Sequence, residues 1–208
     1  MNGSPSRADS ALLAAKKTVR AAVAERRSEM TSQLRSAHDA AIRRHLIEFV
    51  GTLRPPATIC AYLPTFGEAG GTSLPSTLAA AGARVLLPVA GEPGPLDWAE
   101  FHSVSELRPG RFGICEPSGP RLGPEAIADA DIVVVPAVAV SATGLRLGRG
   151  GGYYDQTLPA ARPDARLVCV LDSADVLESV PTEPHDRSVD AVITEEGVRR
   201  FPAGRREE

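Results

Sequence analysis

The stretch from Gly144 to Leu158 has the sequence Gly-Leu-Arg-Leu-Gly-Arg-Gly-Gly-Gly-Tyr-Tyr-Asp-Gln-Thr-Leu. It follows an apolar run, Ile132 to Val140, whose β-branched residues are typical of a buried strand. The residues from Tyr153 to Ala161 are expected to form a helix. A strand, a glycine-rich turn and a helix start in this order predict an α/β fold with the turn at a strand end.

The glycine-rich turn has the composition of an anion-binding loop. Gly148 and the run Gly150 to Gly152 lack a Cβ, so the chain can adopt positive φ angles and approach a ligand closely. Backbone amides of such a turn and of a helix start form a nest for an anion. Arg146 and Arg149 add planar positive charge suited to phosphate or carboxylate. We therefore expect an anion site here rather than a flexible surface turn.

Two common nucleotide motifs do not describe this turn. A P-loop requires Gly-Lys-Ser/Thr after the glycines, which is absent here. The dinucleotide fingerprint requires an acidic residue at the end of a following strand, and none stands at the right distance. The turn therefore predicts a different kind of phosphate site.

The composition argues against nucleic-acid and membrane proteins. The 208 residues carry a net charge of −3, whereas nucleic-acid binders usually have a basic surplus. The longest apolar run, Ile132 to Val140, is far shorter than the ~20 residues of a membrane span, and the first ten residues contain no secretory signal. Cys60, Cys115 and Cys169 lack zinc-site spacing, which favours reduced cysteines in a cytoplasmic protein. We also expect a monomer.

The chain begins with two expected helices and continues with alternating strands and helices. The first helix is expected from Asp9 or Ser10 to about Met30, and the second from Thr31 or Ser32, with an inward Leu34, to Gly51. Strands are expected at residues 58–63, 84–89, 96–101, 132–140, 167–171 and 191–194. Further helices are expected at residues 74–81, 126–130, 153–161 and 174–179. We expect residues 1–10 to be disordered, residues 11–200 to form a single domain, and residues 201–208 to form a charged tail.

Alternation of this kind predicts a mostly parallel sheet with helices on its faces. Such sheets bind ligands beyond the carboxyl ends of their strands. The loop with Glu68, the glycine-rich turn and Asp172 all follow expected strands, so we expect them at one edge of the sheet.

The lysine content points to a second cationic segment. Of the 23 basic residues only two are lysines, the adjacent Lys16 and Lys17. A compact ammonium group is a usual point-charge partner of phosphate. One hypothesis is that Lys16 or Lys17, with Arg20 one turn further on, meets phosphates held at the glycine-rich turn. The alternative is a pair of solvated residues on a surface helix.

The chain resembles the 5-formyltetrahydrofolate cyclo-ligase (methenyltetrahydrofolate synthetase) family over a range from about Ala15 to Thr194. The most specific part of the resemblance is Arg146-Leu-Gly-Arg-Gly-Gly-Gly-Tyr-Tyr-Asp155. Supporting segments are Lys16-Lys-Thr-Val-Arg20, the Tyr62-Leu-Pro loop with Glu68, Phe112-Gly-Ile-Cys-Glu-Pro117, and His185-Asp186 followed by Val189-Asp190. The resemblance implies an α/β/α three-layer fold with a Rossmann-like, mostly parallel sheet and N-terminal helices.

The resemblance also implies an activity and its residues. ATP and Mg²⁺ would drive conversion of 5-formyltetrahydrofolate to 5,10-methenyltetrahydrofolate with release of ADP and phosphate. The implied ATP contacts are Lys16, Lys17, Thr18, Val19, Arg20, Arg146, Leu147, Gly148, Arg149, Gly150, Gly151, Gly152, Tyr153 and Tyr154. The implied folate contacts are Leu63, Glu68, Arg149, Gly150, Gly151, Gly152 and Tyr153. Asp155 and Asp186 would hold Mg²⁺.

The chemistry suggests individual roles. Arg149 is expected to stabilise the transferring phosphoryl group, and Tyr153 to place the formyl group or stack on the pterin. Tyr154 is expected in the core, whereas Glu68 either contacts the pterin or is a solvated loop carboxylate. Asp155 would favour a helix start even without a metal.

Two other functions remain open at this point. One is a sugar-phosphate isomerase or CoA-transferase-like enzyme on the same fold, since fold alone does not fix function. The other is a non-catalytic binder of folate or nucleotide.

Overall fold

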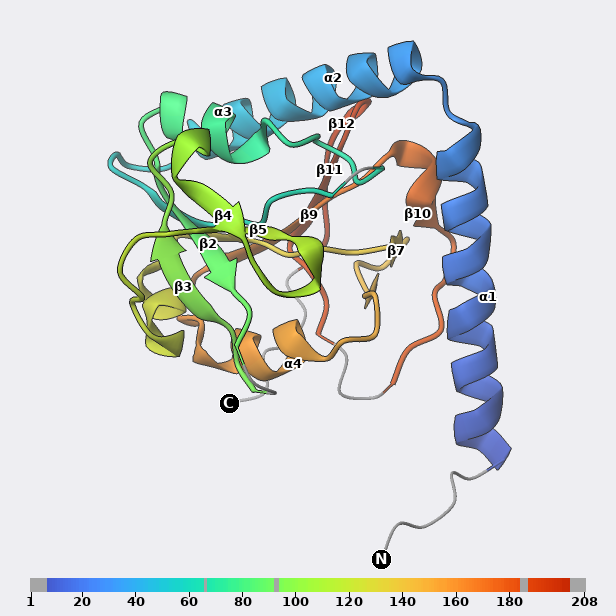
Figure 1. Cartoon of the computed structure of the whole chain (residues 1–208). Coiled ribbons are helices and arrows are strands. Elements are labelled where there is room, and N and C mark those ends of the chain that lie inside the picture. Colours follow the sequence, from blue (N-terminus) through green and yellow to red (C-terminus); the bar gives the residue numbers. More distant parts are fainter. Residues whose placement is uncertain (1–6, 66, 92–93, 184–186, 203–208) are drawn as a thin grey trace, which may run out of the picture.

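A seven-stranded sheet forms the centre of the computed structural model, which describes residues 7–65, 67–91, 94–183 and 187–202 (Figure 1). Its strands are β1 (Thr58–Cys60), β2 (Arg84–Val89), β3 (Asp97–Glu100), β6 (Ile132–Val134), β9 (Arg166–Val170), β11 (Ala191–Thr194) and β12 (Gly197–Arg200). The strand order is β12-β11-β9-β6-β1-β2-β3. The five central strands run parallel, and β3 and β12 add antiparallel edges. The expected mostly parallel sheet is confirmed.

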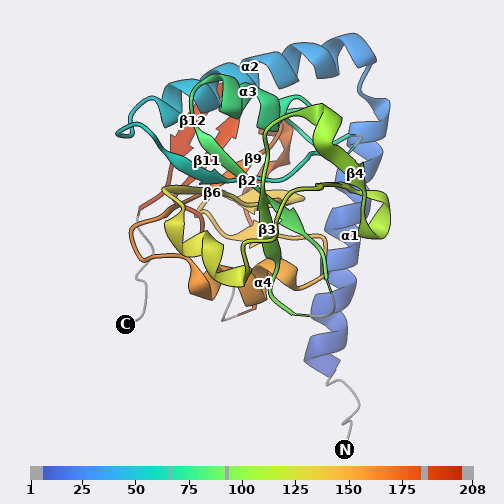
Figure 2. The ribbon, with the colours of Figure 1, turned by 60° about the vertical axis from the view of Figure 1, so that its left-hand side comes forward.

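Helices cover both faces of this sheet (Figures 1 and 2). On one face lie α2 (Ser32–Val50) and α3 (Leu74–Ala80). On the other lie α4 (Tyr153–Thr157) and 3₁₀ helices over Pro124–Asp129 and Leu158–Ala160. This is the three-layer α/β/α arrangement that the sequence predicts.

Side chains of the central strands alternate between two cores. On β6, Ile132 and Val134 pack in the cluster under α2 and α3, whereas Val133 packs in the opposite cluster with Trp98. Burial on both faces explains why these strands are almost continuously apolar. Trp98 is fully buried, as expected for a core residue.

The second helix follows its sequence signals closely. Thr31 caps α2 by accepting a hydrogen bond from the Leu34 amide, and Gly51 ends the helix. The buried positions Ile42, Leu46, Phe49 and Val50 form its inward stripe. Leu34 was expected to face inward, but it is 47% exposed, so that part of the prediction is wrong.

The apolar run 132–140 is not one strand, contrary to expectation. After β6 the chain leaves the central sheet and forms β7 (Ala139–Ser141). This strand joins β8 (Arg146–Leu147) and β10 (Val176–Leu177) in a separate three-stranded sheet. Pro136 lies at the break, and proline cannot donate the hydrogen bond that a continuous ladder requires. The glycine-rich turn therefore follows β8, not the central strand directly.

The first helix packs on this small sheet. α1 (Arg7–Glu29) runs along the side of the molecule (Figure 1). Its Val23 is buried among Val138, Ala139 and Leu147. Because α1 begins at Arg7, residues 7–10 are helical and not disordered as expected.

Several further boundaries differ from the predictions. The expected helix at 174–179 is wrong, because Ser173–Asp175 form a 3₁₀ turn and the next two residues pair as β10. The expected helix 153–161 ends as α-helix at Thr157. Phe201 was placed in a charged tail, yet it is 8% exposed and packs in the core.

A small antiparallel hairpin was also missed. It consists of β4 (Leu107–Pro109) and β5 (Cys115–Pro117), flanked by 3₁₀ turns at Val104–Glu106 and Arg111–Gly113.

Among the described residues, none of the helices combines the length and apolar content needed to cross a membrane.

Candidate functional site

A pocket of about 210 Å³ opens at the carboxyl edge of the central sheet. Residues that follow β1 and end β2 form its apolar wall, and the glycine-rich turn forms the opposite side. The apolar part comprises Tyr62, Leu63, Leu87, Pro88, Ala90, Leu96, Ile114 and Pro136. The polar part comprises Thr65, Glu68, Arg111, Glu116, Arg146, Arg149 and Asp155. Strand ends thus bring the Glu68 loop and the glycine-rich turn together, as predicted.

The glycine-rich turn uses the backbone freedom of glycine at two positions. Gly150 has a φ angle of 97° and Gly152 one of 70°, in the region that other residues rarely adopt. A Cβ on Gly150 would also lie 3.2 Å from a guanidinium nitrogen of Arg20. The turn therefore requires glycine for its conformation at Gly152 and for both conformation and space at Gly150.

The first helix contributes a cation to the turn. The Arg20 Nε donates a hydrogen bond to the carbonyl oxygen of Gly148 at 2.9 Å. Lys16 is buried and its Nζ lies 2.6 Å from Glu183 Oε2, whereas Lys17 is exposed. The structure thus places Arg20 at the turn, leaves Lys17 on the solvated face of the helix, and pairs Lys16 with an acidic loop.

A second arginine fixes a carboxylate at the pocket rim. Arg146 is only 9% exposed, and its Nη2 donates to the carboxylate of Asp155. The Asp155 side chain is 54% exposed, so its carboxylate is open to solvent on one side. The Arg146 Nε is buried and has no hydrogen-bond partner within the described part of the chain. Arg146 therefore orients Asp155, a hard oxygen donor of the kind that Mg²⁺ prefers.

Glu68 and Arg149 form an ion pair that borders both the apolar pocket and a second cavity. Arg149 Nη2 lies 2.7 Å from Glu68 Oε1 and donates to Thr65 Oγ1 at 3.0 Å. The Thr65 amide and hydroxyl donate to Glu68 Oε2 at 2.7 and 2.9 Å. The Glu68 side chain is 8% exposed, so the alternative of a solvated loop carboxylate is wrong. The sequence analysis missed Thr65, although its position three residues before Glu68 suits such a local contact.

The two adjacent tyrosines differ in their contact with the glycine-rich turn. Burial raises the pKa of Tyr154, and its hydroxyl has no hydrogen-bond partner among the described residues. The ring packs against the core under α4, as expected for Tyr154. Both tyrosines line the pocket and pack against the core cluster on this face, but a Cβ on Gly151 would lie 3.3 Å from the Tyr153 ring. Tyr153 is thus the tyrosine whose ring lies against the glycine-rich turn.

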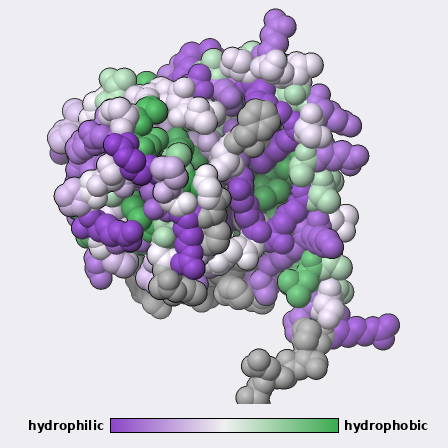
Figure 3. Space-filling view, viewed as in Figure 1, coloured by the Kyte–Doolittle hydropathy of each residue, from purple (hydrophilic) through white to green (hydrophobic). Residues whose placement is uncertain are grey.

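A second, larger cavity of about 770 Å³ adjoins the first. It lies between α1, α2 and the loop at 67–73, and it shares Glu68 and Arg149 with the apolar pocket. Its lining includes Arg20, Arg27, Arg35, Arg43 and Arg149, with Asp39 and Glu68 as acidic members. The face of the molecule in Figure 3 is mostly hydrophilic, with hydrophobic atoms in gaps between charged side chains. Sequence reasoning missed Arg27, Arg35 and Arg43, because arginines on a helix face are ordinarily solvated.

The structure does not place Asp172 in the site. Asp172 follows β9 at the predicted edge, but its carboxylate contacts His38 at 2.9 Å and lines neither cavity. Asp186, the second predicted Mg²⁺ ligand, and its neighbour His185 lie outside the described residues. Asp155 is therefore the predicted metal ligand that the described site contains.

Known proteins resemble this chain over almost its whole length. The model of the 5-formyltetrahydrofolate cyclo-ligase family matches residues 13–195. A 5-formyltetrahydrofolate cyclo-ligase from Mycolicibacterium smegmatis is 39% identical over 184 residues, which cover 86% of this chain and 93% of the relative.

Solved structures give the same result. The 5,10-methenyltetrahydrofolate synthetase of Aquifex aeolicus has a TM-score of 0.72 and 31% identity, covering 93% of this chain and 96% of that one. A second 5,10-methenyltetrahydrofolate synthetase, from Mycoplasma pneumoniae, has a TM-score of 0.70 over 87% of this chain and 99% of that one. Its 19% identity makes it a likeness of fold alone. The family that the residue motifs suggested is confirmed: the chain belongs to the 5-formyltetrahydrofolate cyclo-ligase family.

Proposed function

We propose that this protein converts 5-formyltetrahydrofolate to 5,10-methenyltetrahydrofolate and consumes ATP, releasing ADP and phosphate. One observation supports this proposal most strongly. An apolar pocket, a glycine-rich turn and the side chains of Arg20 and Arg149 lie together at one edge of the sheet. Such an edge suits a reaction between a flat, partly apolar ring system and a polyphosphate.

The substrate explains why a phosphoryl donor is needed. The N5-formyl group is amide-like, so its carbon is a poor electrophile and its oxygen a poor leaving group. Transfer of the γ-phosphoryl group to that oxygen solves both problems, since N10 can then attack the carbon and phosphate can depart. The reaction needs no protein nucleophile, and the protein's main tasks are in-line positioning and charge neutralisation.

The glycine-rich turn and its neighbours are the proposed triphosphate site. The backbone amides of residues 148–152 and the guanidinium of Arg20 would bind phosphate oxygens. Asp155, held by Arg146, would bind Mg²⁺ together with Asp186 and phosphate oxygens. When bound, the ion neutralises negative charge on the phosphates. Lys16 to Val19 lie on the same helix as Arg20 and complete the proposed ATP contacts.

The apolar pocket is the proposed folate site. Leu63 and Tyr153 would pack on the pterin, and the buried carboxylate of Glu68 would accept hydrogen bonds from its amino edge. Such a contact requires Glu68 to exchange Arg149 for the ligand. Arg149 is half exposed, so it can turn toward the transferring phosphoryl group once this pair opens.

A product assay separates this proposal from its alternatives. Purified protein is incubated with 5-formyltetrahydrofolate and Mg²⁺, with and without ATP, while the absorbance of the methenyl product is followed. The proposal expects product only when ATP is present. Product without ATP would contradict the proposed ATP dependence. Ligand binding with no product would favour a non-catalytic binder, and neither binding nor product would favour an enzyme that acts on another substrate, such as a sugar phosphate.

A further inference from the structure

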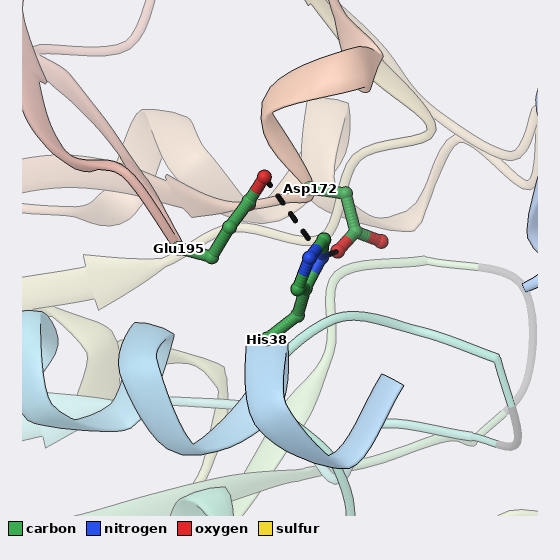
Figure 4. A group of neighbouring side chains, drawn as sticks. All are labelled: His38, Asp172 and Glu195. Carbon is green, nitrogen blue, oxygen red and sulfur yellow. Dashed lines mark hydrogen bonds and ion pairs between the residues drawn. The ribbon is translucent and has the colours of Figure 1, made fainter. Parts of the chain in front are cut away.

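Three side chains of kinds that can bind a metal ion lie close together in Figure 4. His38 comes from α2, Asp172 follows β9 and Glu195 follows β11. Each offers one ligand atom, and the three atoms lie within 4.8 Å of one another. None of the three lines either cavity, so the proposed cyclo-ligase reaction leaves the cluster unexplained.

The distances within this cluster resemble those around a shared metal ion. His38 Nδ1 lies 2.9 Å from Asp172 Oδ1 and 3.8 Å from Glu195 Oε1. In a tetrahedral zinc site with bonds of about 2.0–2.2 Å, neighbouring ligand atoms are separated by roughly 3.4 Å. The two observed distances lie on either side of that value. Small side-chain rotations would therefore bring all three groups into contact with one ion.

Burial and charge also favour a cation. The Asp172 and Glu195 side chains are only 8% and 13% exposed. Two largely buried carboxylates together carry two negative charges, which is costly without a cation beside them. The His38 side chain is 22% exposed, so water can reach the cluster from that side and supply a further ligand.

A neighbouring residue holds one of the carboxylates in place. Ser173 donates its backbone N–H to Glu195 Oε2 at 2.9 Å and its hydroxyl to Oε1. Hydrogen bonds of this kind orient the carboxylate ligands of metal sites. They also restrict Glu195 to the conformation in which it faces His38.

We propose that His38, Asp172 and Glu195 bind one divalent transition-metal ion, for which Zn²⁺ is the appropriate probe. One imidazole with two carboxylates fits zinc better than Mg²⁺ or Ca²⁺, which prefer oxygen ligands alone. The bound ion ties α2 to the ends of β9 and β11. Its effect is on stability, because the ligands are absent from the lining of both cavities.

The test compares zinc bound by matched histidine variants of the full-length protein. Each protein is stripped with a chelator and dialysed against Zn²⁺, and the bound metal is counted. His45 is the control, because it lies on the same helix but its Nδ1 is 2.9 Å from the Thr194 carbonyl, a contact that needs no metal. We expect His45→Ala to bind as much zinc as the unchanged protein and His38→Ala to bind one equivalent less.

A second variant tests the metal site if His38→Ala does not fold. Glu195→Gln preserves the size of the side chain and an acceptor for Ser173 but removes the charged ligand. We expect it to lose the same equivalent of zinc and to lose the rise in melting temperature that zinc gives the unchanged protein. Equal zinc binding by the unchanged protein and Glu195→Gln, with no difference in their melting on zinc addition, overturns the proposal. Both readouts are independent of folate turnover, so they do not depend on the proposed enzyme function.

Discussion

Two arginine–carboxylate pairs in this molecule have the same chemistry but differ in how exposed their arginine is. Arg27 Nε donates to Asp175 Oδ2 at 2.9 Å, and the two side chains are 13% and 1% exposed. Arg149 binds Glu68 at 2.7 Å, but its own side chain is 54% exposed and borders two cavities. The first pair fastens α1 to the turn before β10, whereas a ligand can reach and replace the second. Arg27 also lines the larger cavity, but its low exposure predicts a structural role, whereas the exposure of Arg149 predicts a functional one.

The largest expected effect comes from breaking the buried pair. Asp175→Ala leaves the positive charges of Arg26 and Arg27 facing each other without their shared carboxylate. We expect the free energy of unfolding to fall by about 3–5 kcal/mol, as for other buried pairs that lose one partner. Urea denaturation monitored by circular dichroism measures the change.

An exposed pair provides the control for this variant. Asp164 lies 3.0 Å from Arg162, but its side chain is 78% exposed. Asp164→Ala should lower the free energy of unfolding by less than about 1 kcal/mol. Equal losses for Asp164→Ala and Asp175→Ala would show that burial does not distinguish the pairs.

The next effect falls on turnover and not on folding. We expect Arg149→Ala to lower kcat by about 10² to 10³, which is typical for loss of one preorganised charge donor at a transition state. The protein should stay folded, because Glu68 keeps its two hydrogen bonds from Thr65 when Arg149 is removed. Steady-state rates of methenyl product formation give kcat, with the exposed Arg44→Ala as the control. Wild-type turnover in Arg149→Ala contradicts the functional role of this pair.

A backbone substitution tests the turn that carries Arg149. Gly152 has a φ angle of 70°, and a Cβ there would have room, with its nearest neighbour 3.9 Å away. We therefore expect Gly152→Ala to lower the free energy of unfolding by about 1–2 kcal/mol through backbone strain alone. We expect weaker ATP binding by calorimetry as the turn changes shape. Gly119→Ala, in open space without a positive φ, should leave ATP affinity unchanged.

The smallest effect is expected at Tyr154, a half-buried residue beside the turn. The Tyr154 hydroxyl is buried with no hydrogen-bond partner in the described residues, so Tyr154→Phe removes an unsatisfied group. The free energy of unfolding should stay within about 1 kcal/mol of the original value or rise. A hundredfold loss of turnover in this variant would instead give the hydroxyl a direct part in the reaction.

The sequence predicted the parts of the fold that depend on local patterns. The apolar strands, the Thr31 cap and the glycine-rich turn each have a short-range signal, and the structure contains all three. The break after β6 was missed because the run 132–140 is apolar on both sides of Pro136, although the proline itself was visible. The false helix at 174–179 arose because Asp175 is held by arginines from α1, a contact far away in sequence.

Prediction of the site from the sequence was also limited to contacts with a local signal. Arg20 was expected near the glycine-rich turn and lies there. The pairing of Glu68 with Arg149 joins residues 81 positions apart, and the arginine-lined cavity combines two helices with a loop. Such contacts follow from how layers pack, which no single segment encodes.

The most direct test of the account is a crystal structure with 5-formyltetrahydrofolate and a non-hydrolysable ATP analogue. We expect phosphate oxygens to lie against the amides of residues 148–152 and the guanidinium of Arg20, with the pterin in the pocket beside Tyr153. We also expect Glu68 and Arg149 to have separated. Phosphates bound elsewhere, or an intact Glu68–Arg149 pair beside a bound pterin, would contradict the account.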